Sequence, residues 1–219
     1  MKSLGLRSSK NNRVEAIMTA LKEAHNDART LSGCSLYRMP EYFLCTRVAD
    51  YFAKHFPNLG YRLEMSVSKT LADVGLMDEK IEKLMENENL RGNGRFDLVL
   101  HSGRRRKPAH IIEFKKGHKP ESLAKDINRL ALVSDAVDAS SRPETNYLVF
   151  VTRRHPKRTE EDWRTELKEA LGEITKDEKR DHEIDWDVVR FEQMGPATDP
   201  EFQDTDNPFS MFVIEIRPD

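Results

Sequence analysis

The sequence predicts an α/β protein in which a central mixed β-sheet is flanked by helices. Stretches with apolar residues at helical spacing alternate with short runs of β-forming residues. Their order is two helices, three strands, a helix, a strand, a helix and two strands, with no internal repeat. A chain of 219 residues with 37% hydrophobic and 34% charged residues suits one polar globular domain with a buried core.

The helices are predicted from apolar stripes and from the residues that end them. We expect residues 1–12 to be a loose N-terminal tail and residues 13–219 to form a single domain. The second helix is the best marked, because Pro40 suits a first turn and Pro57 with Gly60 would end it. The predicted helices cover about residues 14–25, 40–56, 78–86, 123–137 and 163–174.

The strands are predicted from alternating or continuous β-forming runs bounded by polar residues. Residues 95–101 and 109–117 flank the basic turn S-G-R-R-R-K-P, which is typical of a hairpin. T-N-Y-L-V-F-V-T reads as a buried strand, as expected inside a sheet covered on both faces. The predicted strands cover about residues 61–67, 95–101, 109–117, 145–152, 185–192 and 209–216.

Charge is distributed unevenly along a chain whose net charge is only -2. Residues 95–119 contain eight basic residues and two acids, whereas residues 160–185 contain eleven acids and five basic residues. Such a distribution can give one positive face for a polyanion and an acidic surface elsewhere, although solvated charge runs are a common alternative.

Cysteine content and hydropathy bear on the compartment. The two cysteines, Cys34 and Cys45, favour a reducing compartment and do not match the spacing of a structural zinc site. No apolar run approaches the length of a membrane helix, and the N-terminal residues lack the apolar region of a secretory signal. We therefore expect a cytoplasmic protein that does not associate with membranes.

The predicted hairpin places charged residues together. Strand side chains alternate, so one face is expected to hold Phe96, Leu98, Leu100, Ile112 and Phe114. The other face would hold Asp97, Glu113 and Lys115, with the two acids opposed if the turn is centred near Arg105. Two adjacent carboxylates repel unless a cation lies between them, and oxygen ligands are those that magnesium prefers.

The alternative is a solvent-exposed sheet face on which Asp97 pairs with Lys115 and Glu113 pairs with an arginine. Exposed ion pairs of this kind are common and contribute little stability. Val99 and Ile111 share the face with the charges, however, which indicates that this face is at least partly covered.

R-F-D at residues 95–97 and I-I-E-F-K at residues 111–115 resemble the motif of the PD-(D/E)XK phosphodiesterases, the restriction-endonuclease-like superfamily. Asp97 matches the motif's aspartate, Glu113 and Lys115 match its (D/E)-x-K, and Phe96 replaces the usual proline. The order of elements over about residues 40–153 is similar to that family's core. The resemblance implies a single restriction-endonuclease-like domain, followed by a C-terminal helix and strands in residues 159–219.

The resemblance also implies a chemistry. Asp97, Glu113 and the backbone carbonyl of Phe114 would hold Mg²⁺, or Mn²⁺ in its place, and Lys115 would stabilise developing charge. Glu41 falls on the apolar stripe of the second helix and is expected to project from its sheet-facing side, where it would position a second metal or its waters. Glu41 has a simpler alternative role at the helix N-terminus, and Glu64 is its rival as the further acid.

Basic residues are the candidate contacts to a nucleic-acid backbone. Lys125 and Arg129 resemble a phosphate-facing pair, although Asp126 and Arg129 have the spacing of a helix-surface salt bridge. Tyr37, Tyr42, Phe43 and Tyr51 are expected in the core rather than as base-stacking platforms. The remaining candidate contacts are Arg104, Arg105, Arg106, Arg153, Arg154, Lys157 and Arg158.

The function predicted from the sequence is that of a metal-dependent nuclease without marked sequence specificity, with DNA favoured over RNA. The alternative is a catalytically inactive module on the same fold that binds nucleic acid or protein. A third interpretation is a structural subunit of a larger machine, in which the acidic segment after Glu160 would be the docking face for a homodimer or a larger complex.

Overall fold

The computed structural model describes residues 6–102, 107–117, 119–138, 143–153, 159–177, 184–195 and 208–217, and these fold into one mixed sheet flanked by helices. The strands are β1 (Leu59–Ser66), β2 (Arg95–Ser102), β3 (Lys107–Lys116), β4 (Asn146–Arg153), β5 (Asp185–Met194) and β6 (Phe209–Arg217). The helices are α1 (Lys10–Ser32), α2 (Glu41–His55), α3 (Val67–Asp73), α4 (Asp78–Met85), α5 (Pro120–Asp135) and α6 (Glu160–Asp177), with the 3-10 turns η1 (Leu36–Arg38) and η2 (Glu88–Leu90).

The sheet has the strand order β1-β2-β3-β4-β6-β5. β3 and β4 run parallel and are connected through α5, whereas the other neighbours are antiparallel. A parallel pair needs such a crossover because the chain must return to the end of the sheet at which the first strand began. The sequence prediction of a mixed sheet with flanking helices is confirmed.

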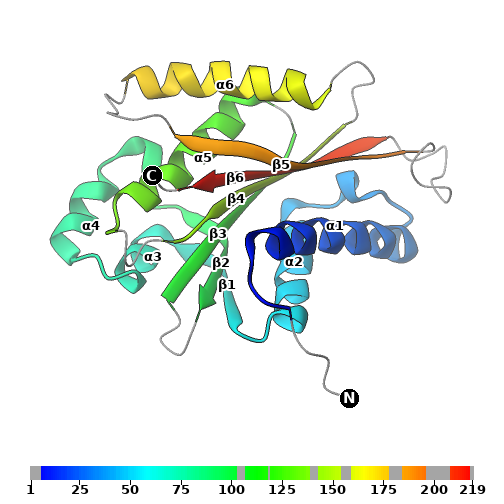
Figure 1. Cartoon of the computed structure of the whole chain (residues 1–219), viewed down its shortest axis with the longest axis horizontal. Coiled ribbons are helices and arrows are strands. Elements are labelled where there is room, and N and C mark those ends of the chain that lie inside the picture. Colours follow the sequence, from blue (N-terminus) through cyan, green and yellow to red (C-terminus); the bar gives the residue numbers. More distant parts are fainter. Residues whose placement is uncertain are drawn as a thin grey trace.

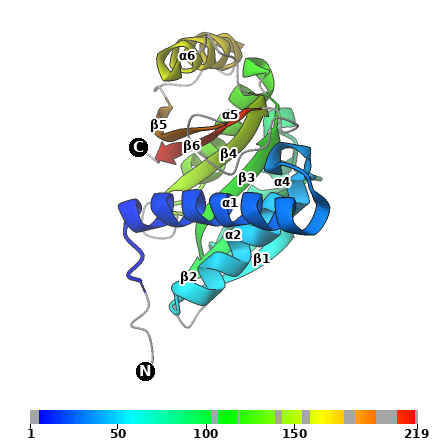
Figure 2. The same cartoon turned by 90° about the vertical axis from the view of Figure 1, so that its right-hand side faces the viewer.

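Helices cover both faces of the sheet and divide the core in two (Figure 1). The first cluster packs α1 and α2 against residues such as Leu98, Ile112 and Val149. The second packs α3 to α6 against residues such as Val99, Ile111 and Phe150. The turned view shows α1 lying across its face of the sheet (Figure 2). The face that carries the motif charges is therefore covered, as Val99 and Ile111 indicated.

Two local features differ from the sequence prediction. α1 begins at Lys10, inside the segment expected to be a tail, because the hydroxyl of Ser9 accepts the N–H of Asn12 and caps the helix. The N–H of Leu6 also bonds to the carbonyl of His55. α3 replaces the expected end of the first strand, since Ser66 caps a short helix in the same way.

The hairpin register agrees with the prediction. Leu98 pairs with Ile112 and Val99 with Ile111, and Asp97 and Glu113 are the next residues beyond the paired part of the two strands. The predicted face of Phe96 is wrong: Phe96 packs in the α5-side cluster, whereas Leu98 packs against α1 and α2. The alternation breaks next to Glu64, which stands opposite Asp97 in the β1–β2 register and has a left-handed φ of 51°.

Candidate active site

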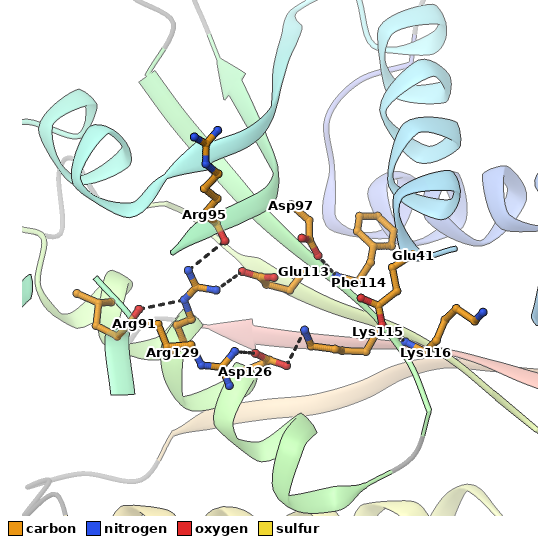
Figure 3. A network of polar contacts seen from close by, with 11 residues as sticks. Glu41, Arg91, Arg95, Asp97, Glu113, Phe114, Lys115, Lys116, Asp126 and Arg129 are labelled. Atoms are coloured by element: carbon orange, nitrogen blue, oxygen red, sulfur yellow. Dashed lines mark hydrogen bonds and ion pairs between the residues drawn. The ribbon is translucent and has the colours of Figure 1, made fainter. Parts of the chain in front are cut away.

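The candidate site lies at the point where β2 and β3 separate, which we call the strand fork. Their pairing ends at Leu98 and Ile112, while β3 continues beside β4 as far as Lys116. The N–H of Phe114 is satisfied there by the carboxylate of Asp97, with 2.7 Å between Phe114 N and Asp97 Oδ2 (Figure 3). The thiol of Cys45 donates to the Asp97 carbonyl at 3.3 Å and ties α2 to this point.

Glu113 points into the α5 side of the fork, where it meets Arg129. The distance from Arg129 Nη1 to Glu113 Oε1 is 2.9 Å, and the two side chains are only 4% and 2% exposed. Arg129 also donates from Nε to the carbonyl of Leu90 and from Nη2 to that of Arg95 (Figure 3). The prediction that Arg129 faces a substrate phosphate is therefore wrong, because its guanidinium is buried and bound to protein.

The connector before β2 makes room for this guanidinium. A Cβ at Gly94 would lie 3.0 Å from Arg129 Nη2 and 2.9 Å from the carbonyl oxygen of Arg91. The guanidinium carbon of Arg129 also stands 4.5 Å from the ring centroid of Phe96, which accounts for the turn of Phe96 toward α5. Gly94 thus serves close packing around Arg129, whereas a Cβ at Gly92 would meet Met85.

The electrostatics of Glu113 are those of a buried acid beside another acid. Burial, reinforced by the negative charge of Asp97, raises the pKa of Glu113 well above its ordinary value, and the charge of Arg129 opposes this only in part. A carboxylate in this position is destabilised in its charged form unless positive charge is added nearby.

Lys115 is paired with Asp126, whose spacing along the helix suggested Arg129 as its partner instead. Its Nζ lies 3.5 Å from Oδ2 of Asp126, a fully buried carboxylate whose Oδ1 is 3.2 Å from Arg91 Nη1. Burial would lower the pKa of Lys115, but the charges of four carboxylates, with Asp126 first, outweigh it and raise the pKa. Lys115 therefore carries a positive charge at neutral pH and suits charge stabilisation rather than proton abstraction.

The charges of α5 are distributed differently from the prediction. Lys125 is exposed, and Asp126 is buried against Lys115 and Arg91 rather than paired with Arg129 on the helix surface. The sequence does carry a signal for Asp126, since it falls on the apolar stripe of Leu123 and Ile127 at helical spacing. A lone acid on such a stripe needs a buried cationic partner.

Two further acids flank the fork from opposite ends. Glu41, in the first turn of α2, accepts the N–H of Lys116 through Oε1 at 2.7 Å and fixes the end of β3. Glu64 is exposed on β1 opposite Asp97. Glu41 therefore reaches the lysine end of the site, as predicted from its helical stripe, while Glu64 reaches the aspartate end.

Cys45 is surrounded by these carboxylates but lacks the features of a nucleophile. Burial, followed by the charges of Asp97, Glu64 and Glu113, raises the pKa of its thiol far above the ordinary range. The thiol stays protonated, consistent with its role as a hydrogen-bond donor.

The donor set suits a hard cation with an incomplete protein shell. Within the described ranges no cluster of three or more histidine, cysteine, aspartate or glutamate side chains has the arrangement of a metal site. Asp97 lies close enough to Glu113 for its negative charge to raise the pKa of Glu113. A divalent cation bound between the two carboxylates would remove this repulsion. Magnesium commonly uses one or two carboxylates and keeps several waters, so the pair fits it.

The expected nucleic-acid contacts are only partly described. Arg153 is exposed at the end of β4, with its guanidinium carbon 5.6 Å from the ring centroid of Tyr37. Tyr42 was expected in the core but is exposed, because it lies on the outer side of α2. Arg104, Arg105, Arg106, Arg154, Lys157 and Arg158 lie outside the described residues.

Comparison of the chain with family models, with curated proteins and with solved structures found no match. Over the described residues, no helix combines the length and the apolar character that crossing a membrane requires.

Proposed function

We propose that the chain is a metal-dependent phosphodiesterase of the PD-(D/E)XK type, with a restriction-endonuclease-like fold and nucleic acid, DNA in preference, as its substrate. The observation that carries the proposal is the meeting of Asp97, Glu113 and Lys115 at one strand fork. Two carboxylates and a charged amine on neighbouring strand ends are the groups that phosphodiester hydrolysis needs.

Asp97 and Glu113, with the Phe114 carbonyl, are the groups that would hold Mg²⁺ or Mn²⁺. When bound, the metal lowers the pKa of a water molecule and adds positive charge beside the scissile phosphate. The high pKa of the buried Glu113 supports this role, because a cation would remove the repulsion from Asp97. The left-handed Glu64 opposite Asp97 adds to the argument, since strained residues concentrate at functional sites.

Lys115 would stabilise the charge that develops on the phosphate oxygens. Its amine is kept charged by Asp126, which also restricts its position at the mouth of the fork. Glu41 holds the backbone at Lys116, so it maintains the strand end on which Lys115 is carried. Asp126 and Glu41 are therefore positioning residues in this proposal.

A module that binds nucleic acid without cleaving it is the second candidate. It is favoured by the ion pair between Arg129 and Glu113, because Arg129 already supplies a positive charge to the carboxylate that a metal would use. In a non-catalytic module Glu113 would stay paired with Arg129 and would not bind a metal.

The test compares the wild type with Asp97→Asn and with Asp50→Asn, a control on the exposed part of α2. Labelled single- and double-stranded DNA and RNA are incubated with Mg²⁺, Mn²⁺ or EDTA. We expect wild-type cleavage that needs the metal, a loss of at least a hundredfold in Asp97→Asn, and little change in Asp50→Asn. A wild type that cuts none of these substrates with either metal refutes the nuclease and leaves the binding module.

A further inference from the structure

A pocket of about 290 Å³ opens directly beside Lys115. It lies between the end of β3, the start of α5 and the 3-10 turn η1. Figure 3 shows Lys115 and Lys116 at this end of β3. The residues that line it and that carry the argument are Tyr37, Lys115, Lys116, Lys119, Ser122 and Leu123.

Three lysines line the pocket: Lys115, Lys116 and Lys119. Among the described residues, no acidic side chain lies within ion-pair distance of Lys116 or Lys119, whereas Lys115 is paired with Asp126. The Lys116 amine instead stands 5.5 Å from the ring centroid of Tyr37, and Arg153 approaches the same ring. Lys116 and Lys119 line the same pocket, so an anion in the pocket would be bound favourably.

The shape of the pocket indicates a ligand larger than a bare anion. Its volume is near the lower end of the range for small-molecule sites, about 300 to 1,000 Å³. Tyr37, which was expected in the core, is only partly buried, and with Leu123 it supplies apolar surface beside the amines. The Ser122 hydroxyl adds a donor. An aromatic ring next to a phosphate-binding group is the combination that receives a nucleotide, because the base stacks while the phosphate is neutralised.

We propose that this pocket binds the phosphate-bearing terminal nucleotide of a nucleic-acid strand. Lys116, Lys119 and Ser122 hold the phosphate, and Tyr37 packs against the base or sugar. The inference rests on the proposed function in one respect: Lys115 forms one wall, so a terminal nucleotide held here lies next to the site of hydrolysis. It makes the enzyme one that acts near strand ends rather than at internal positions.

The test measures binding in EDTA, which removes cleavage from the readout. One fluorescent single-stranded oligonucleotide is prepared with a 5′-phosphate, with a 3′-phosphate and with hydroxyls at both ends. We expect wild-type protein to bind one phosphorylated form at least tenfold more tightly than the unphosphorylated form. Lys116→Ala with Lys119→Ala abolishes this preference, whereas Lys80→Ala, which removes an exposed lysine of α4, retains it.

Several outcomes overturn the inference. Equal affinity of the wild type for all three oligonucleotides refutes it, and so does a preference that survives the double substitution in a variant with an unchanged melting curve. Displacement of the preferred oligonucleotide by an equal concentration of dAMP makes a free nucleotide the ligand and refutes the strand-end assignment. Cleavage without an end preference refutes this inference alone, while an end preference without cleavage refutes only the proposed hydrolysis.

Discussion

The buried pair of Arg129 and Glu113 makes a quantitative prediction about stability. Replacing Arg129 by Met leaves Glu113 buried next to Asp97 without its cationic partner, and also removes donors from the carbonyls of Leu90 and Arg95. Breaking a buried ion pair by removing one partner costs about 3 to 5 kcal/mol. We expect Arg129→Met to reduce the free energy of unfolding at pH 8 by that amount.

A double-mutant cycle separates the ion pair from the size of the side chains. Glu113→Gln alone also destabilises, because it leaves Arg129 without its charge partner. The double variant Glu113→Gln with Arg129→Met should lose less than the sum of the single losses, with a coupling energy of about 1 to 3 kcal/mol. The matched control is Lys69→Met, which breaks an exposed ion pair with Asp73 and should cost no more than about 1 kcal/mol.

Urea unfolding followed by tryptophan fluorescence measures these differences, since buried Trp163 packs against Phe150 and Phe212 in the core. The pH dependence supplies a further check. The pKa of folded Glu113 is raised, so the folded state holds this proton to higher pH than the unfolded state, and stability falls as pH rises above about 4.5. The loss in Arg129→Met should therefore be smaller at pH 5 than at pH 8. A loss below about 1 kcal/mol, or one equal at both pH values, would refute this account of the pair.

Two other predictions concern His110 and the two cysteines. Burial and the charge of Arg13 lower the pKa of His110 from 6.5 to about 3, so the unfolded chain takes up a proton that the folded chain refuses. The stability of the wild type should fall relative to His110→Gln by up to about 1.4 kcal/mol per pH unit below about pH 6.5, and parallel curves in urea titrations would contradict this. Cys45 is buried with a raised pKa whereas Cys34 is partly exposed, so a disulfide reagent at pH 8 should modify one thiol rapidly in native wild type and none in Cys34→Ser. Two fast thiols in the native wild type would show that Cys45 is accessible.

The sequence by itself determined which positions of the two strands carry the motif residues. Strand side chains alternate with a period of two, and the turn residues lie midway between Asp97 and Glu113, so local pattern was enough to predict the register in which their neighbours Leu98 and Ile112 pair. Helical spacing likewise predicted that Glu41 projects toward the sheet, where it meets the N–H of Lys116. The alternation failed at Phe96 because the left-handed Glu64 and the Arg129 guanidinium act on that position from other parts of the chain.

Only the tertiary structure decided how the charges of α5 are used. Helical periodicity gives the direction of a Cβ, but the position of a long side chain depends on which distant groups need a partner. Arg129 binds Glu113 and two backbone carbonyls, and the absence of a side chain at Gly94 leaves the space that this requires. Asp126 pairs with Lys115. Burying a charge is costly unless it is paired, so the partners were set by packing between α5, β3 and the glycine connector rather than by spacing along the helix.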